Sequence, residues 1–165
     1  IRYEDNGNFL FIGRDEKRKN LKLFVQLANF YESKFKFIAV TNKKTDNKSV
    51  IYHISPSEID KKSIISNVGI YIAPNNKSES FGITILEAIN QGNVAICSNI
   101  KAFKTLLNDS GIFFAKDNFE DLKKTINNLN EENLNEIWSK QYNYISQNYS
   151  MDKVLQKWIY VYKNI

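Results

Sequence analysis

The sequence predicts an α/β fold with a parallel sheet of about six strands and helices on both faces. Short apolar runs alternate with longer segments of helical periodicity, which indicates strands joined by helical crossovers. Glycine, proline and serine stand at positions typical of strand and helix ends. The length of 165 residues fits one domain, and we expect a single domain over residues 1–165.

In the first half of the chain, apolar runs bounded by polar residues predict four strands. They are Asn8–Gly13, Phe35–Val40, Val50–Tyr52 and Gly69–Ala73. Apolar residues at helical spacing predict a helix over about Asn20–Glu32. A second helix is predicted to run to about Asn67, with Ser55 as N-cap, Pro56 as its first residue and Glu58 as its third.

The second half of the chain continues the alternation of strands and helices as far as Phe114. Two strands are predicted at Val94–Cys97 and Ile112–Phe114. Helices are expected at Gly82–Gln91, which Gly92 would end, and near Ala102–Leu107.

From Asn118 onward the chain is predicted to be helical. Asn118 is the expected cap of one helix, and a second runs from about Glu131 to Gln147. Ser150 is the expected cap of a third, whose apolar residues are Val154, Trp158 and Val161. The second helix has one apolar face, made of Trp138, Tyr142, Ile145 and Tyr149. This face indicates packing on the sheet, with a membrane-surface helix as the less favoured alternative.

Bulk composition narrows the class of protein. The single cysteine, Cys97, excludes an internal disulfide framework and is typical of a reducing, cytoplasmic compartment. No apolar run has the length of a membrane span, and we expect no signal peptide. Because the chain begins with Ile1, we expect it to be part of a longer protein. The net charge of +5 suits an anionic ligand and leaves a nucleic-acid-binding module as an alternative, although no recognition motif supports it.

Two predicted loops follow the carboxyl ends of strands, where ligands of parallel sheets bind. The first runs from Gly13 through Arg14 to Lys19, whose cations suit a diphosphate. A charged loop in solvent explains this segment equally well, and we expect Lys17 and Arg18 to be only solvated.

The second loop leads into the segment Ser78–Ala88. It places Glu79 in a loop and Glu87 within a helix, on either side of a helix start whose N–H groups suit an anion. Carboxylates accept hydrogen bonds from vicinal sugar hydroxyls, so a nucleotide sugar fits this pattern. Taken singly, Glu79 also fits a surface loop acid and Glu87 the polar face of an amphipathic helix.

This segment resembles the E-x7-E signature of the retaining glycosyltransferases of family 4 (group 1), which have the GT-B fold. The loop from Gly13 and Arg14 to Lys19 resembles the family's G-R-x(n)-K loop, and Pro74 and the Trp158 helix also match. The resemblance covers nearly the whole chain but only the carboxyl-terminal, Rossmann-like lobe of that fold. It therefore implies that the amino-terminal acceptor lobe is absent from this chain and that extra helices follow the sheet.

The resemblance also implies roles for particular residues. Arg14 and Lys19, beside Gly13, would hold the donor diphosphate, Glu87 the ribose and Glu79 the hexose. The backbone of Phe81, Gly82, Ile83 and Thr84 would touch phosphate and sugar. The loop with His53 and Ile54 would lie near the base, although a structural role for His53 is favoured. Glu79, Arg14 and Lys19 are thus the expected catalytic residues.

As a function, the resemblance implies transfer of a hexose from a UDP-, GDP- or ADP-linked donor to a glycan or glycolipid, as in surface polysaccharide biosynthesis. No metal site or cofactor is expected, since the chain has no D-x-D motif. No nucleic-acid partner is expected, whereas the full enzyme could associate peripherally with the inner face of a membrane. An epimerase or phosphorylase of the same fold is the alternative.

One segment departs from the family pattern. The paired glycine and glutamate that often follow the fifth strand are replaced by Ser98–Thr105. This loop is expected to border the donor site, so the departure bears on the sugar contacts.

Overall fold

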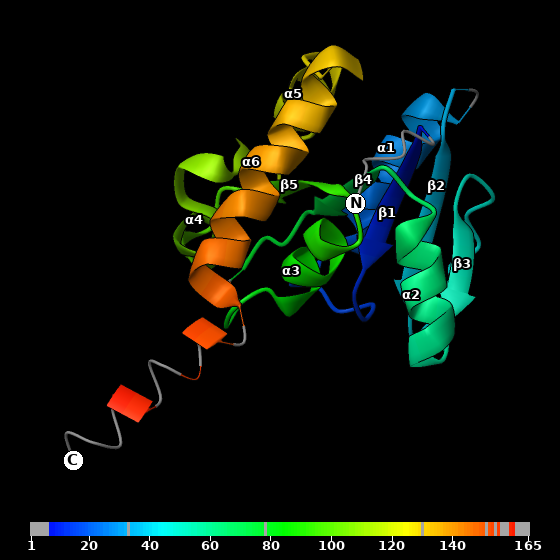
Figure 1. Cartoon of the computed structure of the whole chain (residues 1–165). Coiled ribbons are helices and arrows are strands. Elements are labelled where there is room, and N and C mark those ends of the chain that lie inside the picture. Colours follow the sequence, from blue (N-terminus) through cyan, green and yellow to red (C-terminus); the bar gives the residue numbers. More distant parts are fainter. Residues whose placement is uncertain are drawn as a thin grey trace.

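A central parallel sheet organises the chain in the computed structural model, which describes residues 7–32, 34–77, 79–129, 131–150, 152, 153, 155, 159 and 160 (Figure 1). The strands are β1 (Asn8–Ile12), β2 (Lys36–Thr41), β3 (Ile51–Ile54), β4 (Ile70–Ala73), β5 (Val94–Ser98) and β6 (Ile112–Phe114). Their order is β3-β2-β1-β4-β5-β6, and every adjacent pair is parallel. The order reverses between β1 and β4, so the loops that follow these two strands lie side by side.

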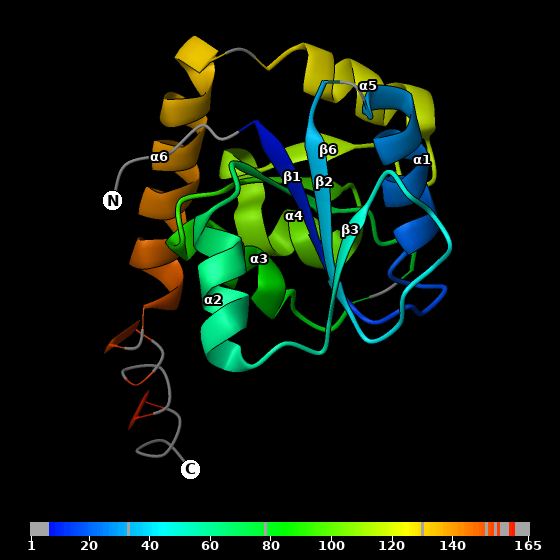
Figure 2. The ribbon, with the colours of Figure 1, turned by 90° about the vertical axis from the view of Figure 1, so that its right-hand side faces the viewer.

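Helices cover both faces of the sheet, as the alternation of elements predicted. They are α1 (Leu21–Tyr31), α2 (Glu58–Ser66), α3 (Ile83–Asn90), α4 (Lys101–Leu107), α5 (Phe119–Asn127) and α6 (Glu131–Tyr149), with a 3-10 turn at Asn108–Ser110. Helices α1 and α5 lie on one side of the sheet, and α2, α3 and α6 lie on the other (Figure 2). Connections of this kind bury both faces of the central strands.

The central strands are nearly uniform apolar runs because both of their faces are covered. Phe9, Leu10 and Phe11 of β1 are almost fully buried, as are all four residues of β4. The Phe9 ring stacks on Phe37 of β2 with centroids 5.0 Å apart, and Phe24 of α1 meets Phe37 edge-on. This aromatic packing holds α1 against β1 and β2, next to the loop from Gly13 to Lys19.

Helix α6 is fixed to the sheet by buried polar groups as well as by apolar packing. The Gln141 side chain donates to the carbonyl of Ala95 at 2.8 Å and accepts from its N–H at 2.9 Å. The indole N–H of Trp138 donates to the carbonyl of Ile89 at 2.9 Å. Trp138 and Ile145 are buried, so the prediction that this face packs in the core is confirmed.

Two predicted boundaries were wrong. Helix α2 begins after Ser57, not after Ser55, because Ser57 is the N-cap and its hydroxyl oxygen accepts from the N–H of Asp60. Ser55 instead has a left-handed backbone, with φ of 43°. Strand β3 extends through His53 and Ile54, which pair with β2, rather than ending at Tyr52.

The predicted third carboxyl-terminal helix is only partly described. Residues 152, 153, 155, 159 and 160 are helical, whereas Val154, Trp158 and Val161 lie outside the described residues. Among the described residues, no helix combines the length and apolar content that crossing a membrane requires.

Candidate functional site

The loop after β1 is built from tight turns that end in a left-handed residue. The N–H of Glu16 donates to the carbonyl of Arg14, and that of Lys19 to the carbonyl of Glu16, both at 2.8 Å. Asn20 then adopts φ of 56°, a conformation that asparagine tolerates, and α1 begins. The N–H of Asn76 donates to the carbonyl of Arg18 at 3.0 Å, so the loops after β1 and β4 are tied together through their backbones.

Glu79 is the centre of the contacts between these two loops. Its Oε2 atom accepts from Arg18 Nη1 and from Asn75 Nδ2, each at 2.9 Å, and from Lys19 Nζ. Its Oε1 atom accepts from the N–H of Ser80 at 3.3 Å. The carboxylate is only 11% exposed, so two cations and an amide hold it in place at the rim of the sheet.

These contacts also determine the protonation of Glu79. Burial acts to raise its pKa, but the hydrogen bond and charge of Lys19, with the charge of Arg18, outweigh burial and lower the pKa below its ordinary value. Glu79 is therefore ionised at neutral pH and accepts hydrogen bonds at both oxygens.

Two cations of this loop, Arg18 and Arg14, have surroundings that differ from the sequence prediction. Arg18, which was expected to be only solvated, bridges Glu79 and Glu16, with its Nε atom 2.8 Å from Glu16 Oε2. Arg14 instead has a 78% exposed side chain, whose nearest carboxylate is Glu16 at 3.9 Å. The correction for Arg18 follows from the adjacency of β1 and β4, which brings Glu79 next to it. Arg14 is left free to move toward a ligand.

Gly13, at the end of β1, leaves room for Lys19. A Cβ atom on Gly13 would lie 3.4 Å from the Lys19 stem and 3.1 Å from the ring of Phe11. Glycine at this position lets the Lys19 side chain run across the strand end toward Glu79.

Helix α3 begins at Ile83, and its N-cap residue is Gly82, which has no side chain to accept a capping hydrogen bond. Gly82 has φ of 99°, and a Cβ there would lie 3.1 to 3.2 Å from Ile85, Phe103 and Leu106. Thr84, in the first turn, shares a 2.9 Å hydrogen bond with the hydroxyl of buried Tyr71, whose pKa burial raises. Gly82 thus lets the chain turn sharply between Glu79 and α3.

The residues on either side of Gly82 face solvent. Phe81 is 41% exposed and Ile83 is 63% exposed, which are large values for apolar side chains. Neither residue is needed to fill the core, and both are accessible to a ligand or partner.

Glu87 lies in α3 but makes its contact with α2 rather than with Glu79. Lys61 Nζ lies 3.1 Å from Glu87 Oε1 and 3.0 Å from Oε2. The two glutamates of the motif therefore belong to two separate ionic clusters, one with Arg18 and Lys19 and one with Lys61. Each cluster pairs a glutamate with one or two cations from an earlier part of the chain.

His53 and Ile54 lie in β3, at the edge of the sheet, and not in a loop as predicted. They pair with Val40 and Thr41 of β2. Because β3 is separated from β1 by β2, these residues stand two strands away from the Glu79 cluster. His53 is half-buried and Ile54 is exposed. Both lie at the carboxyl end of β3, the strand that precedes α2 in the chain.

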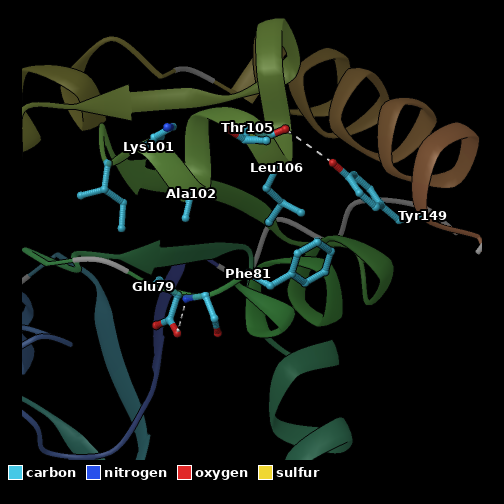
Figure 3. Close-up of a pocket in the computed structure, with 9 residues that line it drawn as sticks. Glu79, Phe81, Lys101, Ala102, Thr105, Leu106 and Tyr149 are labelled. Carbon is cyan, nitrogen blue, oxygen red and sulfur yellow. Dashed lines mark hydrogen bonds between the residues drawn. The ribbon is translucent and has the colours of Figure 1, made fainter.

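A cavity of about 350 Å³ opens between the Glu79 loop and α4 (Figure 3). Residues 79–81 form one wall, and Lys101, Ala102, Thr105 and Leu106 form the other. Tyr149 of α6 closes one end, where its ring meets that of Phe81 edge-on at 5.6 Å. The segment that departs from the family pattern thus lines a cavity next to Glu79.

Sequence reasoning missed three polar residues of this region. Arg18 was expected to be only solvated, although it directly precedes Lys19. Asn75 has no feature in the sequence that marks it as functional, apart from being a polar residue shortly after a strand. Lys61 gave no signal, since 26 residues separate it from Glu87. Ser78, the first residue of the motif, lies outside the described residues.

Solved structures share this fold across nearly the whole chain. A glycosyltransferase from Rickettsia africae ESF-5 superposes with a TM-score of 0.81 at 18% identity, covering 98% of this chain and 48% of that one. Anabaena HepE, solved with UDP and glucose, gives a TM-score of 0.80 at 12% identity, with 98% and 49% covered. The catalytic domain of cholesterol-alpha-glucosyltransferase from Helicobacter pylori gives 0.67 at 19%, with 87% and 98% covered. These likenesses confirm the predicted fold class, a Rossmann-like α/β lobe of the GT-B type.

Sequence comparison assigns the family. The phosphatidyl-myo-inositol mannosyltransferase of Mycobacterium tuberculosis (strain ATCC 25618 / H37Rv) is 36% identical over 52 residues, which are 32% of this chain and 14% of that protein. This chain thus spans a small part of that relative and about half of the first two solved structures. The model of the family described as "Glycosyl transferases group 1" matches residues 2–150. Because this match covers most of the chain, the chain belongs to the group 1 glycosyl transferases.

Proposed function

We propose that this chain binds a nucleoside-diphosphate sugar and forms the donor-binding part of a retaining glycosyltransferase. The observation that carries the proposal is the meeting of Glu79 with Arg18 and Lys19 at the carboxyl ends of β1 and β4. An acid and two cations at one rim match a donor that carries hydroxyl groups next to a diphosphate.

Each charged group then has a distinct part in donor binding. Glu79 accepts from hydroxyls of the donor hexose, and Glu87 accepts from the ribose. Lys19 and the exposed Arg14 approach the diphosphate, together with the N–H groups at the start of α3. Arg18 keeps the Glu79 carboxylate ionised and oriented while these contacts form.

The chemical step follows from the same arrangement. As the bond between the sugar and the diphosphate breaks, negative charge develops on the leaving phosphate. Cations and helix N–H groups that are already in place stabilise that charge and so lower the barrier. In the retaining reaction the acceptor hydroxyl oxygen bonds to the anomeric carbon on the face from which the diphosphate leaves. The hydroxyl proton passes to the departing phosphate oxygen, and Glu79 holds the sugar in position.

The comparisons support donor binding and suggest the class of acceptor. Structures of Anabaena HepE contain UDP, UDP-glucose, or UDP and glucose. The mannosyltransferase of Mycobacterium tuberculosis has phosphatidyl-myo-inositol in its name, which favours a glycolipid or glycan acceptor. Since this chain spans about half of the HepE structures, we propose that the acceptor lobe lies outside it and that the chain alone binds donor without transferring sugar.

A calorimetric titration tests the proposal. The 165-residue chain is titrated with UDP, GDP and ADP, each with and without a hexose, and the Lys19→Ala and Glu87→Ala variants are titrated in parallel. We expect saturable binding of one nucleotide that weakens at least tenfold in both variants, since each loses a charged contact. Lys22→Ala and Glu120→Ala, which change exposed residues of α1 and α5, are the matched controls.

Absence of binding by the intact chain at millimolar nucleotide would count against a preformed donor site. Binding that is unchanged in both variants would place the nucleotide elsewhere on the molecule. Robust sugar transfer by the chain alone would contradict the proposal that the acceptor lobe lies outside it.

A further inference from the structure

Lys61 makes the most enclosed cation contact of the described residues outside the Glu79 cluster. Its side chain is 17% exposed, and its Nζ atom lies 3.0 to 3.1 Å from both oxygens of Glu87. A second acid, Glu58, is 3.7 Å away but 80% exposed, so solvent screens that pair strongly. Glu87 is therefore the main partner of Lys61.

The two helices that carry this pair are also joined by a buried amide close to the pair. Asn93 is fully buried, and its Nδ2 atom donates to the carbonyl of Ile65 in α2 at 2.8 Å and to that of Ala88 in α3 at 3.2 Å. This link helps to set the separation of α2 and α3, since Ala88 directly follows Glu87 and Ile65 lies one helical turn after Lys61. Lys61 spans the same gap to Glu87.

A lysine in this place changes what Glu87 can do. A glutamate side chain on a helix surface samples several rotamers. Fixing one of them when the carboxylate binds a ligand costs conformational entropy. The Lys61 contact restricts that choice before a ligand arrives.

We propose that Lys61 is a positioning residue that holds the Glu87 carboxylate ready to accept from both hydroxyls of the nucleotide ribose. This inference rests on the proposed function, since it takes Glu87 as the ribose-binding group. Lys61 acts through Glu87, so removing the lysine weakens the recognition of the ribose hydroxyls in particular and not nucleotide binding in general.

The test pairs a protein variant with a ligand variant. Four proteins are compared: the intact chain, Lys61→Met, Lys61→Arg and the control Lys62→Met, which changes an exposed residue of the same helix. Each protein is titrated with UDP, GDP and ADP and with their 2′,3′-dideoxy forms. We expect the intact chain to bind the best nucleotide about tenfold more tightly than its dideoxy form, the size of a hydrogen bond to a charged group. In Lys61→Met this ratio falls to about threefold or less, whereas Lys61→Arg and Lys62→Met keep it.

The outcomes separate this inference from the proposed function. An intact chain that binds no nucleotide, or does not distinguish the dideoxy form, overturns the ribose role of Glu87 and this inference with it. An intact chain that discriminates while Lys61→Met discriminates equally well overturns the inference alone. Equal weakening of both ligands in Lys61→Met also overturns it, because the lysine then acts as a general cation. Thermal unfolding of each variant verifies that the compared proteins are folded.

Discussion

Arg18 Nη1 and Glu79 Oε2 lie 2.9 Å apart, although 61 residues separate them in the sequence. Their contact joins the loops after β1 and β4, and Lys19 binds the same carboxylate oxygen. The rim is thus organised by the protein's own side chains, and a donor that binds Glu79 shares it with two cations.

Arg18 and Arg14 are expected to affect different properties. Arg18→Ala removes the bridge to Glu16 and Glu79, and we expect it to lower the free energy of unfolding by about 1 kcal/mol. Arg14→Ala changes an exposed side chain, so stability should change by less than about 0.5 kcal/mol while nucleotide affinity falls. Urea denaturation and calorimetry on both variants measure the two effects. Equal stability loss in the two variants would contradict the division of roles.

Glu79 is expected to make stability depend on pH in the acid range. Its lowered pKa means that the folded protein favours the carboxylate, so its contribution is present above the ordinary glutamate pKa of about 4.3 and is lost as the pH falls through the lower native value. The difference in unfolding free energy between the intact chain and Glu79→Gln should be about 1 kcal/mol near neutrality and shrink below about pH 4. Denaturation from pH 3 to 7 measures it.

The matched control for this pH series is Glu120→Gln, which changes a 77% exposed glutamate of α5. A difference that stays constant over the whole pH range in Glu79→Gln would show that the Arg18 and Lys19 contacts do not stabilise the carboxylate.

Gly82→Ala adds only one methyl group, yet we expect it to destabilise the fold strongly. Alanine would have to adopt φ of 99°, and its Cβ would press on Ile85, Phe103 and Leu106 at 3.1 to 3.2 Å. We expect a loss of about 2 kcal/mol from these two effects together. Ile83→Ala, which changes the exposed neighbour, should cost less than about 0.5 kcal/mol. Thermal unfolding compares them, and a Gly82→Ala variant as stable as Ile83→Ala would refute the strained geometry.

Gln141→Leu should loosen α6 from the sheet. Gln141 satisfies both backbone groups of Ala95, and leucine would leave these buried groups unpaired at a cost of about 2 to 4 kcal/mol. Hydrogen exchange should show faster exchange at the N–H of Ala95 in this variant. Gln147→Leu makes the same chemical change at an exposed position of α6 and should leave both stability and exchange nearly unchanged.

The strands and most helices were predictable because their signals are local. Strand β4 is apolar at every position since both faces are covered, and the apolar spacing in α1 and α6 reports directly which side meets the sheet. The errors arose where two local signals competed. Ser55 and Ser57 both resemble helix caps, and only the bond from Asp60 to Ser57 decides between them.

The α/β class, the order of elements and the positions of Glu79 and Glu87 relative to α3 could be predicted from the sequence alone, since each depends on residues that are near one another in the chain. The contact of Arg18 with Glu79, the contact of Lys61 with Glu87 and the place of His53 in an edge strand could be read only from the folded chain. These partners are brought together by the strand order β3-β2-β1-β4-β5-β6. Ionic contacts across 26 or 61 residues leave no periodic trace in the chain, because a charged side chain in a loop looks the same in the sequence whether water or a distant carboxylate surrounds it.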